Sequence, residues 1–339
     1  MKKLIIIFFA IINLFASNIT IYNETNQSSE INSTNEEVVS LDDEFVSLTP
    51  KINICVLINK NKFYKFIPSI INSLNSYLLY KNVDYNLSVY DINITIESLQ
   101  NCNNIFVYSL KKDFIANLQN YPNKNFFIPL FYKDDLNISS QNIYFGGIDY
   151  KNQINMLSSY IDDDSAVAIN DNTNLSNKLF NIESNLLKIY PFNYPKINYK
   201  FLNNKFIFFN TTAGKTAQIL SQITYENIDT KLQLTTQINY NPILIGITQP
   251  QDIDKLLIAN SIINYPLALE DINLLLNTDI KFNWLNYASN ILLNKVYNLQ
   301  TNGDEFFMND FKIYIFNNQI NYKTNLYQII NGGFKKIDN

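Results

Sequence analysis

The order of apolar and polar positions along residues 51–91 predicts a strand, a helix and a second strand. Residues 52–58 are an almost unbroken apolar run, typical of a strand buried on both faces of a parallel sheet. Apolar residues recur at helical spacing over 67–78, and Pro68 falls in the first turn, where its missing N–H would have no helical partner. Residues 85–90 return as a strand. The folded part of the chain therefore opens with a β-α-β unit.

The same alternation of strands and helices continues as far as residue 149. It predicts further strands over 105–108, 126–130 and 144–147 and a helix over 112–119. Pro129 cannot donate to a sheet, so the strand that contains it should lie at an edge or end there. Strands that alternate with helices imply right-handed crossovers and a parallel sheet covered on both faces.

A second series of the same kind begins at residue 150. The pattern predicts helices over 150–161, 175–189, 216–224 and 284–296, strands over 166–169, 206–209, near Leu232 and over 243–247, a turn over 190–195, and a closing hairpin of 311–316 with 326–330. The predicted fold class is α/β, with two doubly wound parallel-sheet lobes joined by a hinge. We assign 51–149 to the first lobe and 150–339 to the second, whose late segments could cross back to the first.

Residues 1–16 have the pattern of a cleavable signal peptide. Two lysines precede a mainly apolar run of thirteen residues, which is shorter than the roughly 20 residues that span a membrane. A buried N-terminal helix is the alternative. Residues 17–50 contain seven acidic residues and no lysine, which predicts a flexible acidic tether. We therefore expect a soluble protein that is periplasmic or otherwise exported, with no stable membrane insertion after signal cleavage.

Two asparagines of the tether, Asn26 and Asn32, lie in the form acidic-x-Asn-x-Ser/Thr, which resembles the extended acceptor site of bacterial N-glycosylation. Flexible backbone is accessible to the transferring enzyme, so these two residues are the predicted acceptors. The same form occurs at Asn86, Asn93 and Asn137. Asn86 falls within a predicted strand, where we interpret the match as accidental.

The two cysteines, Cys55 and Cys102, lie in the first predicted strand and just before the third. In the strand order 2-1-3-4-5 these two strands are neighbours, and an exported protein permits a disulfide. A bond requires the two Cα atoms to lie within about 7 Å. Because Cys55 is placed in the middle of its strand and Cys102 at the entrance of the other, we favour two buried free thiols and keep the disulfide as the alternative.

The composition excludes several classes of chemistry. With no histidine and no arginine, all 26 basic residues are lysines, so the chain offers no Ser-His-Asp or Cys-His catalysis and no His-ligated metal. Without arginine the chain has no side chain that can bind a carboxylate or phosphate through two parallel hydrogen bonds. Its net charge of −4 argues against binding of nucleic acid. Residues 209–216 lie between a predicted strand and a predicted helix, as a phosphate-binding loop does. Phe209 occupies the position of that motif's first glycine, where the backbone must curl around phosphate, so the stretch argues against a nucleotide triphosphatase. We predict a non-enzymatic protein with no cofactor and no metal.

Several stretches of the chain resemble the type I periplasmic binding-protein superfamily, which includes branched-chain amino-acid receptors and envelope regulators. They are the opening strand 54–58, the passage 144–149 that leads into a helix, the second-lobe strand and loop 166–172, and the terminal strand pair. The resemblance covers about residues 51–334 and is one of pattern and order. It implies two lobes that close around a small solute by a hinge.

In such a fold, ligands lie between the lobes, at the carboxyl ends of the strands. That rule selects six polar residues as candidate ligand-binding residues: Asn59, Ser109, Tyr132, Asp171, Asn172 and Thr248. Each could instead be a loop residue or a helix cap. Without arginine, the expected ligand is neutral or zwitterionic and is bound by hydroxyls, amides and aromatic faces.

The predicted function is binding of a small solute. The alternative is a cell-envelope scaffold or regulator with the same fold, whose partner is another envelope protein. A hydrolase is a third and less favoured class, because without histidine it would need a Ser-Lys arrangement that no spacing singles out. Converging polar groups between the lobes would favour the receptor, whereas a cleft filled by Phe, Tyr or Leu side chains would favour the scaffold.

Overall fold

The structure of the protein is a computed structural model, which describes residues 19–20, 51–136, 138–162 and 166–337. The predicted signal peptide, most of the acidic tether and the sequon asparagines Asn26, Asn32 and Asn137 lie outside these residues and stay predictions. Two residues of the tether range form strand β1 (Ile19–Thr20), which pairs with β3. In the part of the chain that the structure describes, no helix has the length and apolarity needed to cross a membrane.

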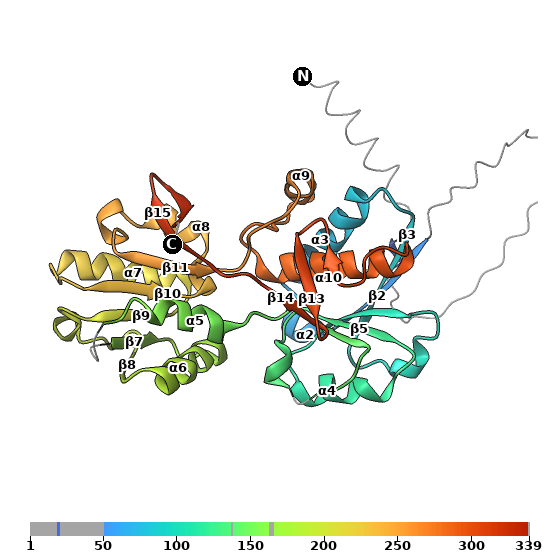
Figure 1. Ribbon diagram of the computed structural model, residues 1–339, viewed down its shortest axis with the longest axis horizontal. Helices are drawn as coiled ribbons and strands as arrows, with labels where there is room; N and C mark the ends of the chain where they lie inside the picture. The colour runs from blue at the N-terminus through green and yellow to red at the C-terminus, as the bar shows by residue number, and fades with distance from the viewer. Residues whose placement is uncertain (1–18, 21–50, 137, 163–165, 338–339) are drawn as a thin grey trace, which may run out of the picture.

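Two sheets, with helices on both faces of each, form two lobes that lie side by side along the longest axis of the molecule (Figure 1). The sheet of the first lobe has the strand order β1-β3-β2-β4-β5-β6-β14-β13-β12. It is parallel from β1 to β14 and antiparallel beyond. Its other strands are β2 (Ile52–Ile58), β3 (Tyr85–Asp91), β4 (Asn104–Tyr108), β5 (Asn125–Ile128), β6 (Ile143–Phe145), β12 (Phe307–Met308), β13 (Ile313–Phe316) and β14 (Gln319–Asn321).

The sheet of the second lobe has the order β16-β15-β11-β10-β9-β7-β8. It is parallel from β8 to β11, and β15 and β16 add to it in antiparallel fashion. Its strands are β7 (Ala166–Asn170), β8 (Ile189–Asn193), β9 (Phe206–Asn210), β10 (Leu232–Thr235), β11 (Leu256–Asn260), β15 (Asn325–Ile330) and β16 (Gly333–Lys336).

Helices alternate with the parallel strands in both lobes. Those of the first lobe are α2 (Lys60–Phe63), α3 (Ile67–Tyr80), α4 (Lys112–Asn117), α9 (Leu267–Leu275) and α10 (Trp284–Gln300). Those of the second lobe are α5 (Tyr150–Ser158), α6 (Asn174–Leu186), α7 (Ala213–Tyr225) and α8 (Pro242–Ile247). Short 3₁₀ helices are η1 (Ile96–Ser98), η2 (Leu118–Asn120), η3 (Lys133–Asp135), η4 (Tyr199–Leu202), η5 (Gln237–Asn239) and η6 (Pro250–Asp252).

Within the described residues, the chain crosses between the lobes at three places (Figure 1). Residues 146–149 lead from β6 to α5, 261–266 lead from β11 to α9, and 322–324 lead from β14 to β15. After its passage through the second lobe, the chain therefore returns to complete the first sheet with β12 to β14.

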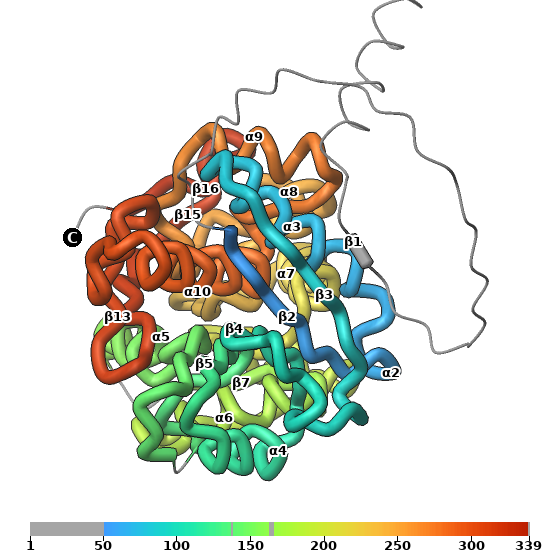
Figure 2. The backbone as a smooth tube through the Cα atoms, turned by 90° about the vertical axis from the view of Figure 1, so that its right-hand side faces the viewer, coloured from blue at the N-terminus to red at the C-terminus, as the bar shows by residue number. Residues whose placement is uncertain are grey.

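The strands of the first sheet are apolar because both of its faces are buried. On one face, Val56 and Phe106 pack in a core with α3 and α10. On the other face, Leu57 and Val107 pack in a core that includes Ile115 of α4. Figure 2 looks onto this lobe and shows α10 and α4 on opposite sides of the sheet. The unbroken apolar run that predicted β2 is thus the consequence of a sheet that lies between two helical layers.

A line of buried asparagines runs along α10, and two of them join it to α3. Asn286, Asn290, Asn294 and Asn298 recur every four residues along α10, and each is at most 6% exposed. The Asn290 amide donates a hydrogen bond to the Ser73 hydroxyl of α3 at 2.7 Å. The Oδ1 atoms of the first three have no partner within the described residues. Such directional contacts fix the register of two helices at a cost in stability.

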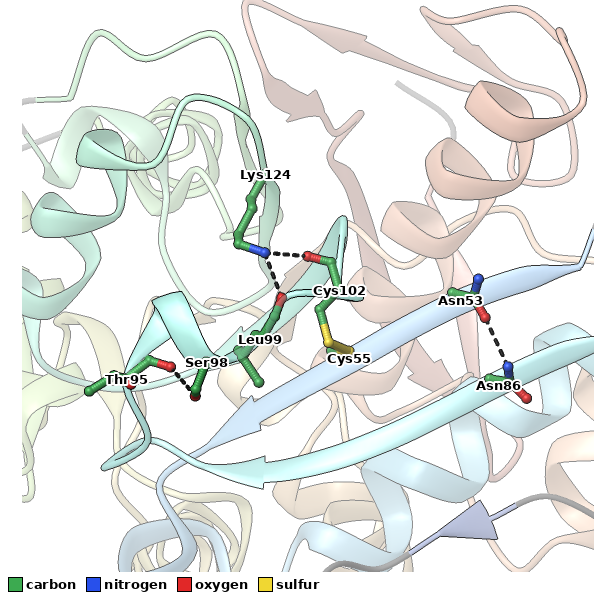
Figure 3. The surroundings of a disulfide bond; sticks show 8 residues. All are labelled: Asn53, Cys55, Asn86, Thr95, Ser98, Leu99, Cys102 and Lys124. Carbon is green, nitrogen blue, oxygen red and sulfur yellow. Dashed lines mark hydrogen bonds between the residues drawn. A yellow bond between two sulfur atoms is a disulfide. The ribbon is translucent and has the colours of Figure 1, made fainter.

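Cys55 and Cys102 form a disulfide, with their Cα atoms 5.8 Å apart (Figure 3). The prediction of two free thiols is therefore wrong. Strands β2 and β4 are neighbours, as the strand order predicts. The turn before β4 lies over β2 and is held there by Lys124, whose Nζ donates to the backbone oxygens of Leu99 and Cys102 at 2.6 and 3.0 Å. This turn, which the sequence pattern does not describe, brings the two sulfur atoms together.

Two strands of the second sheet differ from the prediction. Residues 190–195, predicted as a turn, contain most of β8, an edge strand that pairs with β7. Residues 256–260, a region without a predicted strand, form the buried strand β11. Strand β8 is hard to recognise because it includes Pro191 and has no fully buried position and no regular alternation of exposed and half-buried positions.

The predicted strand over 243–247 and the predicted closing hairpin are also wrong. Residues 243–247 belong to helix α8, which begins at Pro242 and is capped by Asn241, whose side chain accepts a hydrogen bond from the N–H of Ile243. Strand β13 pairs with β14 in the first lobe, whereas β15 pairs with β11 and β16 in the second. The two halves of the expected hairpin thus lie in different lobes.

A buried carboxyl group lies in the core of the second lobe. Glu183 of α6 has no exposed surface, and its Oε2 accepts a hydrogen bond from Asn210 at 2.8 Å. Its Oε1 has no partner within the described residues. Burial raises the pKa of Glu183 to about 8, although the hydrogen bond from Asn210 acts in the opposite direction. The folded protein therefore holds this carboxyl group mainly protonated at neutral pH.

Loss of the disulfide should lower the free energy of unfolding by up to about 4 kcal/mol, because the bond joins residues 47 positions apart and restricts the unfolded chain. Denaturant unfolding with and without a thiol reductant measures the effect. In the double variant Cys55→Ala/Cys102→Ala, the reductant should change nothing. Equal sensitivity of both proteins to the reductant would contradict the bond.

The free energy of unfolding should fall as the pH rises from about 4.5 towards 8, by up to about 1.4 kcal/mol per pH unit, through Glu183 alone. The sign follows because the folded state keeps a proton that the unfolded state releases in this range. Glu183→Gln keeps an acceptor for Asn210 and should remove this part of the pH dependence. Urea unfolding of both proteins across this range tests the prediction, and parallel pH profiles would show it to be wrong.

Candidate functional site

The carboxyl edges of the two sheets are turned toward the junction between the lobes. This follows because the crossings at 146–149 and 261–266 leave from the carboxyl ends of β6 and β11, and the other parallel strands of each sheet point the same way. Loops that follow parallel strands at such an edge are the usual place for a ligand.

Two predicted site residues of the first lobe have local roles at this edge. Asn59 follows β2 and caps α2, where its side chain accepts a hydrogen bond from the N–H of Lys62 at 3.1 Å. Ser109 follows β4 and has no exposed surface, and its Oγ accepts a hydrogen bond from the N–H of Lys111 at 3.1 Å. Both side chains therefore stabilise their own loops.

Asp171 and Asn172 follow β7 in the second lobe. Asp171 accepts hydrogen bonds from the Thr173 hydroxyl at 2.7 Å and from Lys215 Nζ at 3.0 Å. Burial acts to raise the pKa of Asp171, but the hydrogen bonds from Thr173 and Lys215 prevail and lower it. Asn172 is exposed and has a φ of 61°, a left-handed conformation that asparagine tolerates.

Thr248 does not follow a strand, because the expected strand before it is helix α8. It ends that helix, and its hydroxyl donates to the backbone oxygen of Leu244 at 2.7 Å. Of the six predicted site residues, Tyr132 alone lines the pocket between the lobes that is described next.

A pocket of about 600 Å³ lies between the lobes. Its wall in the first lobe contains Tyr132, Asp134 and Asp135, from the end of the loop after β5 and from η3. Its wall in the second lobe includes Asn177 and Lys178 of α6. The search for polar residues just after predicted strands found Tyr132 but missed the other lining residues. Asp134 and Asp135 belong to η3, which begins directly after Tyr132, and Asn177 and Lys178 lie one turn inside α6.

An ion pair joins the two walls of this pocket. Lys178 of α6 contacts Asp135 of η3, and the two side chains are 35% and 26% exposed. The Lys178 ammonium also lies 5.6 Å from the centroid of the Tyr150 ring. A pair as exposed as this one contributes at most about 1 kcal/mol, so it favours the observed arrangement of the lobes only weakly.

A phenol and a carboxylate lie together at the first crossing. The Tyr132 hydroxyl is 3.4 Å from Oδ2 of Asp149, which also caps α5 by accepting a hydrogen bond from the N–H of Asn152 at 2.9 Å. Burial, with the charge of Asp149, raises the pKa of Tyr132 to about 12. Tyr132 is therefore a neutral donor in the pocket, and Asp149 offers it a charged acceptor.

A buried network of hydrogen bonds connects α5, the helix that follows the first crossing, with the second and third crossings. Gln153 of α5 donates to the Ser261 hydroxyl at 2.9 Å and to Gln237 Oε1 at 3.2 Å, and it accepts from the Gln237 N–H at 3.0 Å. The Ser261 hydroxyl lies 3.1 Å from the hydroxyl of Thr324 on the third crossing. The Thr324 hydroxyl also accepts a hydrogen bond from the side-chain amide of Asn152 at 3.3 Å. No sequence pattern indicates this network, because its members are distant along the chain.

The glycine pair of the first crossing is required by close packing. An added Cβ at Gly147 would lie 2.1 Å from backbone atoms of Phe131 and Tyr132, and one at Gly146 would lie 3.0 Å from Pro129. The N–H of Gly147 donates to the backbone oxygen of Phe131 at 2.8 Å. Gly147 therefore sets the position of the loop that carries Tyr132 into the pocket.

Aromatic side chains fill another part of the junction between the lobes. Phe282, in the turn before α10, packs on the core of the second lobe. Its ring centroid lies 5.4 Å from that of Tyr240 and 5.8 Å from that of Phe334. Tyr240 also contacts the ring of Tyr327 at 5.2 Å. This contact between the lobes is apolar and does not depend on charge.

In the regions that the structure describes, no group of His, Cys, Asp or Glu side chains is arranged to hold a metal ion. The carboxylates that line the pocket can accept hydrogen bonds from organic ligand groups, such as ammonium and hydroxyl groups.

Gly147→Ala should destabilise the protein and displace the loop that carries Tyr132, because the new methyl group would overlap the backbone at Phe131. We expect a loss of about 3 kcal/mol or more in the free energy of unfolding. Gly214→Ala on α7 is the matched control, since an added Cβ there meets no atom within 4 Å. Denaturant unfolding of both variants tests this, and a Gly147 variant as stable as the control would refute it.

Comparison with known proteins identifies relatives of the fold alone. No family model matches the sequence, and none of the curated proteins matches it. Among solved structures, an extracellular ligand binding receptor from Desulfohalobium retbaense matches with a TM-score of 0.62 and 10% identity over 85% of this chain. The match covers 59% of that receptor, so this chain spans about three-fifths of its length.

Two further structures show the range of proteins with a similar fold. A branched chain amino acid ABC transporter protein from Thermus thermophilus with bound valine matches with a TM-score of 0.61 and 10% identity, over 86% of this chain and 96% of that one. LpoA from Haemophilus influenzae matches with a TM-score of 0.56 and 9% identity, over 86% of this chain and 59% of that one. The predicted fold class is confirmed: this chain has the type I periplasmic binding-protein fold.

Proposed function

We propose that the protein is a non-enzymatic receptor that binds a small neutral or zwitterionic solute between its two lobes. The observation that carries this proposal is the pocket of about 600 Å³, which is lined by polar groups of both lobes. That volume falls within the usual range of small-molecule sites. The Thermus thermophilus relative with bound valine supports the choice of ligand class.

The charges of the pocket fit a zwitterion. Asp134, Asp135 and Asp149 contribute three carboxylates, and Lys151 and Lys178 contribute two ammonium groups. A zwitterionic ligand can replace the pair between Asp135 and Lys178 with two pairs of its own, so neither protein charge loses its partner on binding. Because these two residues come from different lobes, such a ligand would hold the lobes together.

A second candidate function is a scaffold or regulator that acts through contacts with an envelope protein. The ring contacts of Phe282 with Tyr240 and Phe334 favour it, since aromatic side chains fill part of the junction between the lobes. The local hydrogen bonds of Asn59 and Asp171 also favour it, because these groups are already satisfied without a ligand.

Export fits both candidates. We propose a periplasmic location with cleavage after residue 16, and modification of the tether at Asn26 and Asn32 remains a prediction from the sequence. The intact mass of the secreted protein tests cleavage and glycosylation together.

A thermal-shift screen of residues 17–339 against amino acids, short peptides and sugars should identify a solute that raises the melting temperature. Asp149→Asn keeps the cap of α5 but removes one pocket charge, so it should weaken binding of a zwitterion by about tenfold or more. Asp229→Asn is the control, because Asp229 pairs with Lys255 in the second lobe and is 86% exposed.

A flat response across the panel would reject the receptor in favour of the scaffold. Binding that is equally weakened by both substitutions would place the ligand elsewhere.

A further inference from the structure

A second hollow lies wholly within the first lobe. It is a groove of about 510 Å³ beside β6, α10 and β13, and Tyr144, Lys295 and Phe306 are among the residues that line it. Helix η3 separates it from the pocket between the lobes, since Asp134 and Asp135 line that pocket whereas Lys133 lines the groove. Neither the fold nor the proposed receptor function requires this groove.

The groove contains a buried lysine with an exposed counter-charge. The side chain of Lys295 is 4% exposed, and its Nζ donates to the backbone oxygen of Glu305 at 2.6 Å. The carboxylate of Glu305 is 3.6 Å away and 61% exposed. An ammonium has three donor positions, and both of these contacts are made by one residue. Burial lowers the pKa of Lys295, although Glu305 acts in the opposite direction.

Two aromatic rings lie beside this ammonium. The Lys295 Nζ lies 5.5 Å from the centroid of the Tyr144 ring and 5.8 Å from that of Phe306. The Phe306 side chain is 66% exposed, which is unusual for so large an apolar group beside a groove. A second ammonium group, that of Lys133, lies at the groove, where it donates to the backbone oxygen of Asn317 at 2.8 Å.

We propose that this groove is a binding site for a small aromatic carboxylate, whose carboxylate pairs with Lys295 and whose ring lies against Phe306. A carboxylate fits because a desolvated ammonium pairs most strongly with a compact anion of fixed charge. A flat ring fits because it would cover the exposed face of Phe306. Glu305 occupies the anion position when the groove is empty and competes with the ligand for Lys295.

The competition by Glu305 gives the sharpest test. Benzoate is the probe. Calorimetric titration measures its affinity for the full chain after signal cleavage, first for the unchanged protein and then for each variant. Glu305→Gln removes the internal competitor and should raise the affinity for benzoate by about threefold or more. Phe306→Ala should lower it by about threefold, and Lys295→Met by about tenfold or more.

Lys255→Met is the matched control for the loss of a lysine. Lys255 also donates to a backbone oxygen, that of Thr230, and pairs with an exposed carboxylate, that of Asp229, but it lies in the second lobe. It should leave the affinity for benzoate unchanged. If Lys295→Met fails to fold, Glu305→Gln and Phe306→Ala decide the matter, because both side chains are exposed and neither is part of the core.

The proposal is overturned if benzoate does not bind up to millimolar concentration, or if Glu305→Gln and Phe306→Ala leave its affinity unchanged. It is also overturned if Lys178→Met abolishes binding while Lys295→Met does not, since the anion would then lie between the lobes. A flat thermal-shift response to amino acids, short peptides and sugars would reject the receptor function but would not bear on benzoate binding in this groove, so the two hypotheses are separable.

Discussion

The buried hydrogen bonds that join α5 to the second and third crossings constrain how the chain passes between the lobes. Gln153, Gln237, Ser261 and Thr324 come from four distant parts of the chain, and each is at most 7% exposed. An unpaired polar group at such a place is costly, so each contact of the network supports the others. These bonds hold the second and third crossings against α5 at the second lobe, so they limit the path of the chain between the lobes.

The candidate sites follow from this arrangement. Because the first crossing passes Gly147 directly against the loop after β5, Tyr132 and η3 are fixed at the boundary of the lobes. Helix η3 then directs Asp135 toward the second lobe and Lys133 toward the groove beside α10. One short segment of the first lobe thus contributes charged groups to two separate hollows.

The sequence predicted the features that depend on local pattern. The β2-α3-β3 unit is confirmed because the helical repeat of α3 is long enough to have a single interpretation, and the two runs beside it then complete a β-α-β unit. Helix α8 was misassigned because a short apolar run fits a strand as well as a helix. The disulfide, the pairing of β14 with β6 and the contact between Asp135 and Lys178 depend on segments distant along the chain, which no local pattern can bring together.

The two lobes contact each other through a charged pair at one place, Asp135 with Lys178, and through aromatic rings at another, Phe282 with Tyr240. This ion pair is partly exposed, so dissolved salt screens it, whereas the ring contact of Phe282 with Tyr240 is apolar and is little affected. A rise in ionic strength therefore weakens the contact of Asp135 with Lys178 and leaves the contact of Phe282 with Tyr240 almost unchanged.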